Sequence, residues 1–227
     1  MEWLDSWPER MTTGLLAGQL ADGSFGCHPY RKWTRAHWRL VSLVELGLPP
    51  GHADGVAAAE TVLNWIASPS ESRVIAGRER RHASMEGNAI FVCCRLGLSG
   101  DPRVRLLVER LLHAQWPDGG RNCDEHPAAW HSSFHESVTP IRGLAAYAEA
   151  TGDGTALSTA RRAAASAQCA RPASSRTRGR PRRWSGCERS SGPTVGSERP
   201  GAGTGGRQAV AVKPAWRRST GATPRQS

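Results

Sequence analysis

The 227-residue sequence lacks the cysteine spacing of a structural zinc site, and it lacks long apolar runs. It contains six cysteines but no Cys-x-x-Cys pair, which argues against a zinc ribbon, a dithiol redox motif or a disulfide framework. The longest wholly apolar run, residues 89–94, is far shorter than the ~18 residues that predict a membrane span. The N-terminus lacks the basic start and apolar core of a signal peptide. We therefore expect a soluble, cytoplasmic protein without a membrane span.

Large apolar side chains and acidic residues are scarce in the last quarter of the chain. Residues 169–227 carry 13 Lys and Arg against two acidic residues, and they contain no Leu, Ile, Phe, Tyr, Met or Asp. Such a segment buries too little apolar surface to offset the entropy of ordering it. We expect a disordered basic tail at 169–227, which binds nucleic acid only non-specifically, after a near-neutral domain at 1–168. A frameshifted reading frame is the favoured origin of this tail, because the change in composition falls within the repeat architecture; a genuine basic tail is the alternative.

The first 168 residues show a succession of helical patterns. Apolar residues recur there at helical spacing, and Gly or Pro separates the segments. The segments expected to be helical are 11–20, 34–46, 53–67, 84–96, 102–115, 135–150 and 155–168.

Two sequence features repeat along this domain. Leu-Gly-Leu occurs at 46–48 and again at 96–98, and a Gln-x-x-Asp-Gly turn occurs at 19–23 and at 115–119, about two periods apart. Within a period, a helix that is apolar on all sides precedes a helix with one apolar face, which predicts an inner and an outer layer. The expected fold class is all-α, a partial α/α toroid of about three helical hairpins with a period of ~50 residues, or a curved α-solenoid.

Four motifs carry a resemblance to a known family. They are Lys32–Leu40, Arg80–Asn88, Asp118–Asp124 and His131–Ser137. In this order they resemble short bacterial prenyltransferase- and squalene-cyclase-like proteins, within the α/α-toroid superfamily of terpenoid cyclases and protein prenyltransferase β subunits. The resemblance covers about residues 3–162 and implies a toroid with a central cavity for an isoprenoid or another apolar substrate. It leaves open whether the chain is an enzyme, because the subfamily is named mainly by its fold.

The sequence departs from the family pattern in several places. Arg35 replaces a Gly and Arg121 replaces a Trp. We expect Arg121 to lose the aromatic packing between repeats or to lay its aliphatic stem over the surface. The Asp-x-Asp-Asp motif of class II terpene cyclases is absent, which disfavours their chemistry. Three hairpins are too few to close a toroid, so we expect an oligomer or aggregate and an inactive, truncated form.

Histidines stand at the starts of three expected inner helices. In a toroid, such starts line one mouth of the cavity, where helix N-termini favour an anionic group such as a diphosphate. The residues expected to be catalytic are Asp124, His131, His135 and Glu136. The residues expected to bind substrate are His37, Trp38, Arg81, His82 and Glu86. The alternative for residues 131–136 is helix capping and hydrogen bonding within the loop.

The sequence predicts no bound metal or cofactor, and zinc is the one that it leaves open. Cys123 and Asp124, together with His131 or His135, offer ligand types that zinc accepts, although their spacing matches no zinc motif of the family. The alternative is a buried thiol and a turn-forming carboxylate. The basic segment 78–82 is expected to be a loop, which is either solvated or a phosphate clamp.

The sequence thus predicts a terpenoid-cyclase- or prenyltransferase-like domain that handles an isoprenoid or another apolar small molecule. A non-catalytic helical-repeat scaffold or binding protein is the alternative. Binding of an isoprenoid diphosphate separates the two.

Overall fold

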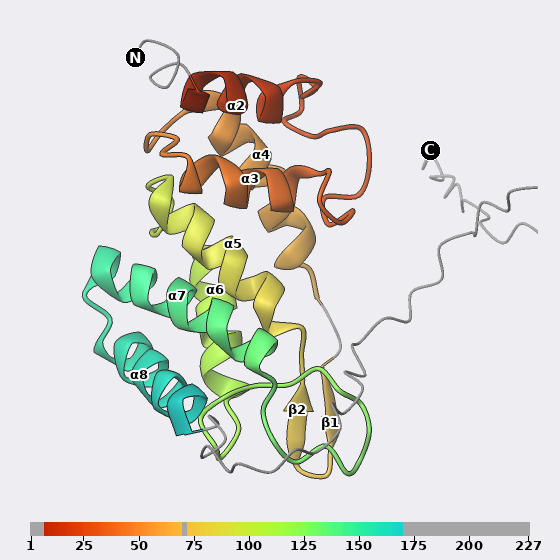
Figure 1. Ribbon diagram of the computed structural model, residues 1–227, viewed down its shortest axis with the longest axis vertical. Helices are drawn as coiled ribbons and strands as arrows, with labels where there is room; N and C mark the ends of the chain where they lie inside the picture. The colour runs from red at the N-terminus through yellow and green to blue at the C-terminus, as the bar shows by residue number, and fades with distance from the viewer. Residues whose placement is uncertain (1–6, 70–71, 170–227) are drawn as a thin grey trace, which may run out of the picture. The chain divides into compact units, whose positions relative to one another are not determined.

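The computed structural model describes residues 7–69 and 72–169. These residues form seven helices and one antiparallel hairpin, joined by loops (Figure 1). The helices are α2 (Trp7–Leu16), α3 (Ala36–Glu45), α4 (Ala53–Ile66), α5 (Ala83–Arg95), α6 (Pro102–His113), α7 (Phe134–Thr151) and α8 (Gly154–Cys169). The strands are β1 (Arg73–Ile75) and β2 (Arg78–Arg80). No helix among these residues is both long enough and apolar enough to cross a membrane.

The predicted helical class is confirmed for the described residues. Six helices begin and end within two residues of the expected bounds, and α2 begins and ends four residues earlier than expected. The prediction of a loop at 78–82 is wrong for residues 78–80, which form β2. The tail predicted at 169–227 lies outside the described residues, apart from Cys169 at the end of α8.

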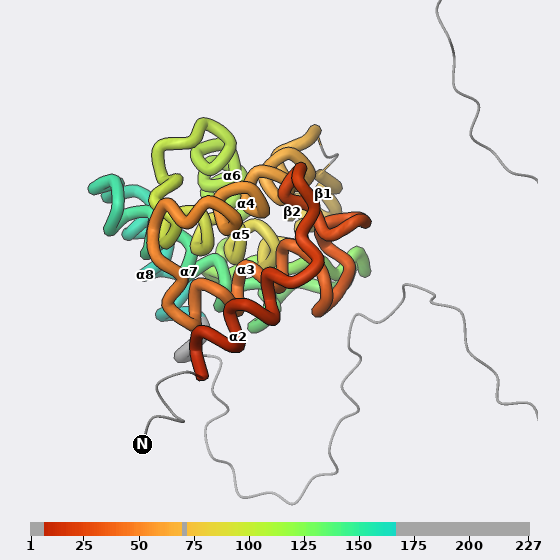
Figure 2. Tube along the Cα trace, turned by 90° about the horizontal axis from the view of Figure 1, so that it is seen from above, coloured from red at the N-terminus to blue at the C-terminus, as the bar shows by residue number. Residues whose placement is uncertain are grey.

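Helix α5 is the centre of the packing. It contacts α3, α4, α6 and α7, and nearly every residue between Ala83 and Cys93 is buried. Seen from above, α5 lies between α4 and α6 on one side and α3 and α7 on the other (Figure 2). The chain pairs as the hairpins α3–α4, α5–α6 and α7–α8. The expected all-round burial of the helix at 84–96 is therefore confirmed, whereas closure into a toroid stays a prediction.

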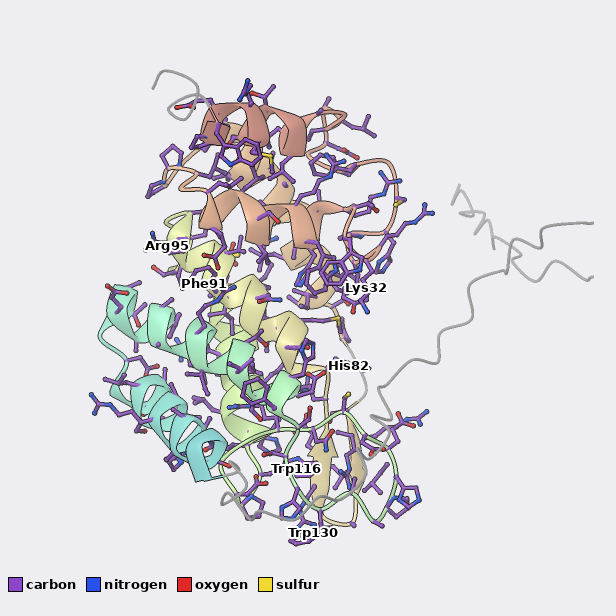
Figure 3. All side chains as sticks on the ribbon, in the orientation of Figure 1. Lys32, His82, Phe91, Arg95, Trp116 and Trp130 are labelled. Atoms are coloured by element: carbon purple, nitrogen blue, oxygen red, sulfur yellow. The ribbon has the colours of Figure 1, made fainter. Side chains whose placement is uncertain are left out.

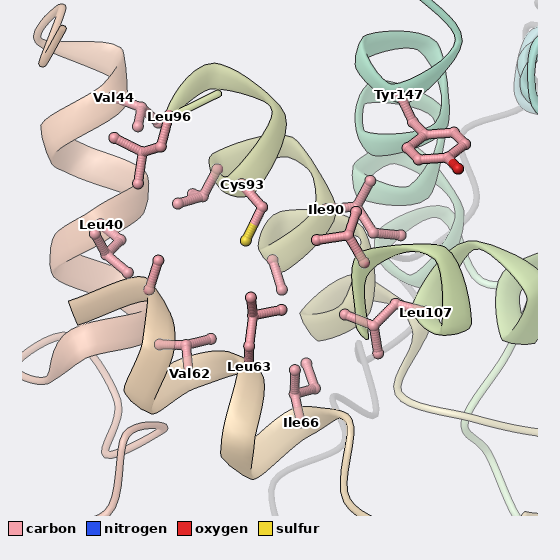
Figure 4. Close-up of a cluster of buried hydrophobic side chains, with 14 of the residues drawn as sticks. Leu40, Val44, Val62, Leu63, Ile66, Ile90, Cys93, Leu96, Leu107 and Tyr147 are labelled. Carbon is pink, nitrogen blue, oxygen red and sulfur yellow. The ribbon is translucent and has the colours of Figure 1, made fainter. Parts of the chain in front are cut away.

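The hydrophobic core contains buried side chains from each of the helices α3 to α8. Leu40, Leu63, Ile90 and Leu107 come from α3, α4, α5 and α6 and meet in this core (Figure 4). Each is at most 1% exposed, and burying a side chain of this size contributes about 1.5–3 kcal/mol. Helix α6 buries one face only, as its i, i+3, i+4, i+7 pattern predicts.

The two Gln-x-x-Asp-Gly turns adopt the same hydrogen bonding. The amide Nε2 of Gln19 donates to the carbonyl four residues later at 3.0 Å and to that of Asp54 in α4 at 2.9 Å. The amide Nε2 of Gln115 donates to the carbonyl four residues later at 2.7 Å and to that of Thr159 in α8 at 3.1 Å. Each turn therefore docks on the second helix of the following hairpin, which confirms the repeat.

At the C-terminal ends of three helices, backbone carbonyls accept hydrogen bonds from an arginine side chain. Arg39 donates to the carbonyls of residues 15 and 17, Arg110 to those of residues 66–68, and Arg121 to that of residue 111. These carbonyls lie at the C-terminal ends of α2, α4 and α6, where a positive charge is favourable. The Gln-x-x-Asp-Gly turn does not recur after α4, about one period from each of its two copies, and Arg110 supplies the link at this helix end.

Arg121 is buried, so the expectation that its stem lies over the surface is wrong. Its side chain is 1% exposed, and its Nε and one terminal nitrogen donate to the Leu111 carbonyl at 3.0 and 2.6 Å. Burial lowers the pKa of Arg121 to about 10, so the guanidinium stays charged at neutral pH. The position that is aromatic in the family pattern here binds the end of α6.

Helices α5 and α7 cross at two glycines. A Cβ atom at Gly87 would lie 2.5 Å from the backbone nitrogen of Pro140. A Cβ atom at Gly143 would lie 2.4 Å from the carbonyl oxygen of Gly87. No side chain fits at either position without separating the helices.

We expect Gly143→Ala to lower the free energy of unfolding by about 1–3 kcal/mol, because the added methyl group overpacks the crossing. Urea unfolding followed by circular dichroism measures this change. Gly14→Ala is the matched control, since nothing lies within 4 Å of a Cβ atom at that site in α2. The control should be neutral or stabilising by up to ~1 kcal/mol. Equal stability of the two variants would contradict the close crossing.

Candidate functional site

A cavity of about 280 Å³ lies beside the start of α5. Its wall combines residues from the end of α4, the β1–β2 hairpin, the first turn of α5 and the α6–α7 connection. Apolar groups come from Trp65, Ile66 and Met85, and polar groups include Arg81, His82 and Cys123. The cavity thus gathers titratable side chains from segments that are far apart in the sequence.

The β1–β2 hairpin and the α6–α7 connection run side by side (Figure 1). The indole nitrogen of Trp116 donates to the carbonyl of Glu79 at 2.8 Å. Arg80 lies over the Trp116 ring, 4.5 Å from its centroid, and donates to the carbonyl of Ala129 at 3.0 Å. Arg80 is 5% exposed, so the interpretation of this segment as a solvated loop is wrong for its side chain.

Arg81 is held between two carboxylates. It lies 2.7 Å from an oxygen of Glu79 and 2.7 Å from an oxygen of Glu86, and Arg110 lies 3.8 Å from the same Glu86 oxygen. Burial raises the pKa of Glu86, although Arg81 and Arg110 oppose this shift. The positive charge of Arg81 is therefore largely neutralised within the protein.

A second group of side chains adjoins the cavity. A ligand atom from each of His82, Cys123 and Glu136 lies within 4.8 Å of the other two. His82, labelled in Figure 3, precedes α5, Cys123 lies in the α6–α7 connection, and Glu136 lies in the first turn of α7. The Nδ1 atom of His82 is 4.0 Å from Oε1 of Glu136, which is an ion-pair distance rather than a hydrogen bond. The other oxygen of Glu136 accepts the backbone N–H of Ser84 at 2.8 Å.

The charges within this cluster influence one another. Interaction with Glu136 raises the pKa of His82. Burial would raise the pKa of Glu136, but His82 and the Ser84 N–H lower it below its ordinary value. Burial raises the pKa of Tyr30, and electrostatic interaction with Glu136 and Cys123 raises it further, so this phenol lies near the cluster. At neutral pH, Glu136 is a carboxylate.

The structure brings together some of the predicted site residues. His82 and Glu136 share the cluster, and Arg81, His82 and Glu86 line the cavity. Of the suggested zinc ligands, Cys123 belongs to the cluster. Tyr30 was missed, because nothing in its sequence neighbourhood indicates proximity to residues about a hundred positions later.

Asp124, His131 and His135 are not among the residues that line the cavity. The ring of His131 stacks on Trp130 with centroids 3.5 Å apart, and both His131 and His135 are exposed. A carboxylate oxygen of Asp124 accepts the backbone N–H of His126 at 2.9 Å, as the turn-forming alternative predicts. Their catalytic roles stay predictions.

His37 is packed among aromatic rings. It is 2% exposed, and its ring centroid lies 6.0, 5.3 and 5.9 Å from those of Tyr30, Trp38 and Trp65. Burial lowers the pKa of His37 to about 4, so the ring is neutral at physiological pH. The roles of His37 and Trp38 in substrate binding stay predictions; the geometry gives His37 a place in the core.

Comparison with protein-family models, with curated proteins and with solved structures gives no match for this chain. The resemblance to α/α-toroid proteins therefore rests on the four sequence motifs.

We expect the stability of the protein to fall as the pH is lowered from about 6.5 to 4, partly because the unfolded state protonates His37 while the folded state does not. This residue contributes up to about 3 kcal/mol of the fall. Urea unfolding at pH 7, 5.5 and 4 should show a smaller loss in His37→Leu than in the wild type. The exposed-residue control His131→Gln should keep the wild-type loss; a wild-type loss in His37→Leu as well would contradict the buried neutral ring.

Proposed function

We propose that the domain expected at 1–168 is a terpenoid-cyclase- or prenyltransferase-like partial toroid that binds an isoprenoid, or a similar apolar molecule with an anionic head group, beside the start of α5. The two-sided lining of the cavity is the observation that carries the proposal. Trp65, Ile66 and Met85 offer an apolar wall, and Arg73 and His82 lie on the polar side. The volume of about 280 Å³ is close to the lower end of the ~300–1,000 Å³ range of small-molecule sites.

Arg73 is the cation best suited to an anionic head group. Its guanidinium is paired with Glu125 at 2.6 Å, but both side chains are more than half exposed. An exposed pair of this kind contributes little free energy, so Arg73 can exchange its partner for a ligand anion at small cost. Arg81, by contrast, is already bound by Glu79 and Glu86.

The apolar wall suits the hydrocarbon part of such a ligand. An indole ring attracts a developing positive charge on its face, as cyclisation of an isoprenoid would require. Of the four residues predicted to be catalytic, Glu136 forms an ion pair with a cavity-lining group, His82, at 4.0 Å. Glu136 is therefore the candidate that we retain for a role in proton transfer or in binding.

A non-catalytic scaffold is the second candidate. Two observations favour it: the buried charges of Arg81 and Glu86 neutralise each other, and aromatic side chains in the α6–α7 connection and at the first residue of α7 are exposed. Trp130 and Phe134 are 63% and 70% exposed, which suits contact with another protein. Assembly into an oligomer remains part of this alternative.

Isothermal titration of the full chain with farnesyl diphosphate and with farnesol tests the proposal. We expect saturable binding of the diphosphate. Arg73→Gln should weaken it about three- to fivefold, since an exposed ion pair contributes up to ~1 kcal/mol. The same substitution should leave farnesol binding unchanged.

Arg95→Gln is the matched control, because Arg95 is exposed at the end of α5 and does not line the cavity. It should bind both ligands as the wild type does. Absence of saturable heat with either ligand would reject the isoprenoid proposal and leave the scaffold.

A further inference from the structure

We propose that His82, Cys123 and Glu136 bind a zinc ion that keeps one coordination position open toward the cavity. Their ligand atoms lie within 4.8 Å of one another. In a tetrahedral zinc site with these donors, neighbouring ligand atoms are about 3.3–3.6 Å apart, as metal–ligand distances of about 2.0–2.3 Å require. Side-chain rotations that move the ligand atoms by roughly 1 Å would bring them to this spacing. The side chain of His82 is exposed enough to rotate in this way.

The donor set favours zinc over the hard divalent cations. It combines an imidazole nitrogen, a thiolate sulfur and a carboxylate oxygen, all of which are zinc ligands. Magnesium and calcium prefer oxygen ligands alone, and the thiolate selects against them. Three protein ligands with a fourth position open to solvent are typical of a catalytic site rather than a structural one.

The protein holds two of the ligands in place before a metal arrives. Glu136 is 5% exposed, and one of its oxygens is fixed by the Ser84 N–H at 2.8 Å, which leaves the other oxygen for a metal. Asn122 braces the loop at Cys123: its Oδ1 accepts the N–H of Asp124 at 3.0 Å, and its Nδ2 donates to the carbonyl of His131 at 2.9 Å. Such outer contacts orient the ligands of metal sites.

The third ligand, His82, occupies the N-cap position of α5 without using its side chain as a cap. Its ring instead turns toward Glu136 and also forms part of the cavity wall. A metal at this point is therefore reached from the cavity. It can coordinate an oxygen of a ligand head group, or a water molecule whose pKa it lowers to about 7.

This site differs from the zinc set that the sequence suggested. Asp124, His131 and His135 are replaced by His82 and Glu136, which come from the starts of α5 and α7. Metal binding follows from this geometry alone, so it holds whether or not the cavity accepts an isoprenoid.

Metal titration of the full chain, purified metal-free, tests the site. We expect one tightly bound equivalent of Zn²⁺, and with Co²⁺ the near-ultraviolet charge-transfer band of a cobalt–thiolate bond. Cys123→Ser should abolish this band, whereas the control Cys27→Ser should retain it. His82→Ala and Glu136→Gln should each weaken Zn²⁺ binding at least about tenfold, since even outer-shell changes cost 10–100-fold.

The variants also separate loss of the site from loss of the fold. His82 is 61% exposed at its side chain, so His82→Ala should keep the wild-type circular dichroism spectrum even if Cys123→Ser unfolds. Zn²⁺ binding by His82→Ala at wild-type affinity, or a cobalt–thiolate band that survives in folded Cys123→Ser, would overturn the proposal. Failure to bind farnesyl diphosphate would leave the metal site untouched.

Discussion

The close crossing of α5 and α7 is the constraint on which the candidate site depends. Gly87 and Gly143 let the two backbones touch, because neither has a side chain to hold the helices apart. The same crossing brings the first turn of α7 against the first turn of α5, where Glu136 accepts the N–H of Ser84. A buried carboxylate is costly unless it is hydrogen-bonded or paired. The helix crossing and the placement of Glu136 therefore stabilise each other.

Arginine side chains stabilise several helix ends and buried carboxylates inside the domain. Arg39, Arg110 and Arg121 bind the carboxyl ends of three helices, and Arg81 neutralises two carboxylates. Each of these charges is used within the protein, where a helix end or an acidic group offsets the cost of burial. Arg80 and Arg81 in the basic segment at 78–81 are consequently bound to groups of the protein itself, so their charges are not free to bind a ligand. An exposed cation such as Arg73 has that freedom.

The sequence was sufficient to predict the helices, because their buried apolar residues recur at helical spacing. The pattern of Val104, Leu107 and Leu111 predicted the buried face of α6, and the repeated glutamine turns predicted matching contacts. The β1–β2 hairpin was missed, because its three-residue strands show no alternation of apolar and polar side chains. Its order comes from distant contacts, such as the Trp116 indole on Glu79.

The candidate site, like the hairpin, depends on contacts between residues that are distant in the sequence. His131 and His135 are one helical turn apart, but His131 precedes α7 and both rings are exposed. The partner of Glu136 is His82, more than fifty positions earlier, and only the tertiary packing reveals it. Burial of Arg121 was equally hidden, since a charged side chain is normally expected at the surface. Local spacing thus identified residue types suited to a site, while the helix crossing decided which of them meet.

The 4.0 Å separation between His82 and Glu136 links this packing to the proposed chemistry. The distance is too long for a hydrogen bond, and the carboxylate has already satisfied its other oxygen with Ser84. A metal ion between the two groups would give both a ligand bond and would draw in the thiol of Cys123. Because His82 and Cys123 also line the cavity, the ion would lie where the head group of an apolar ligand is expected. The cluster and the cavity would then form one site, with hydrocarbon binding on the Trp65 wall and metal coordination at its polar end.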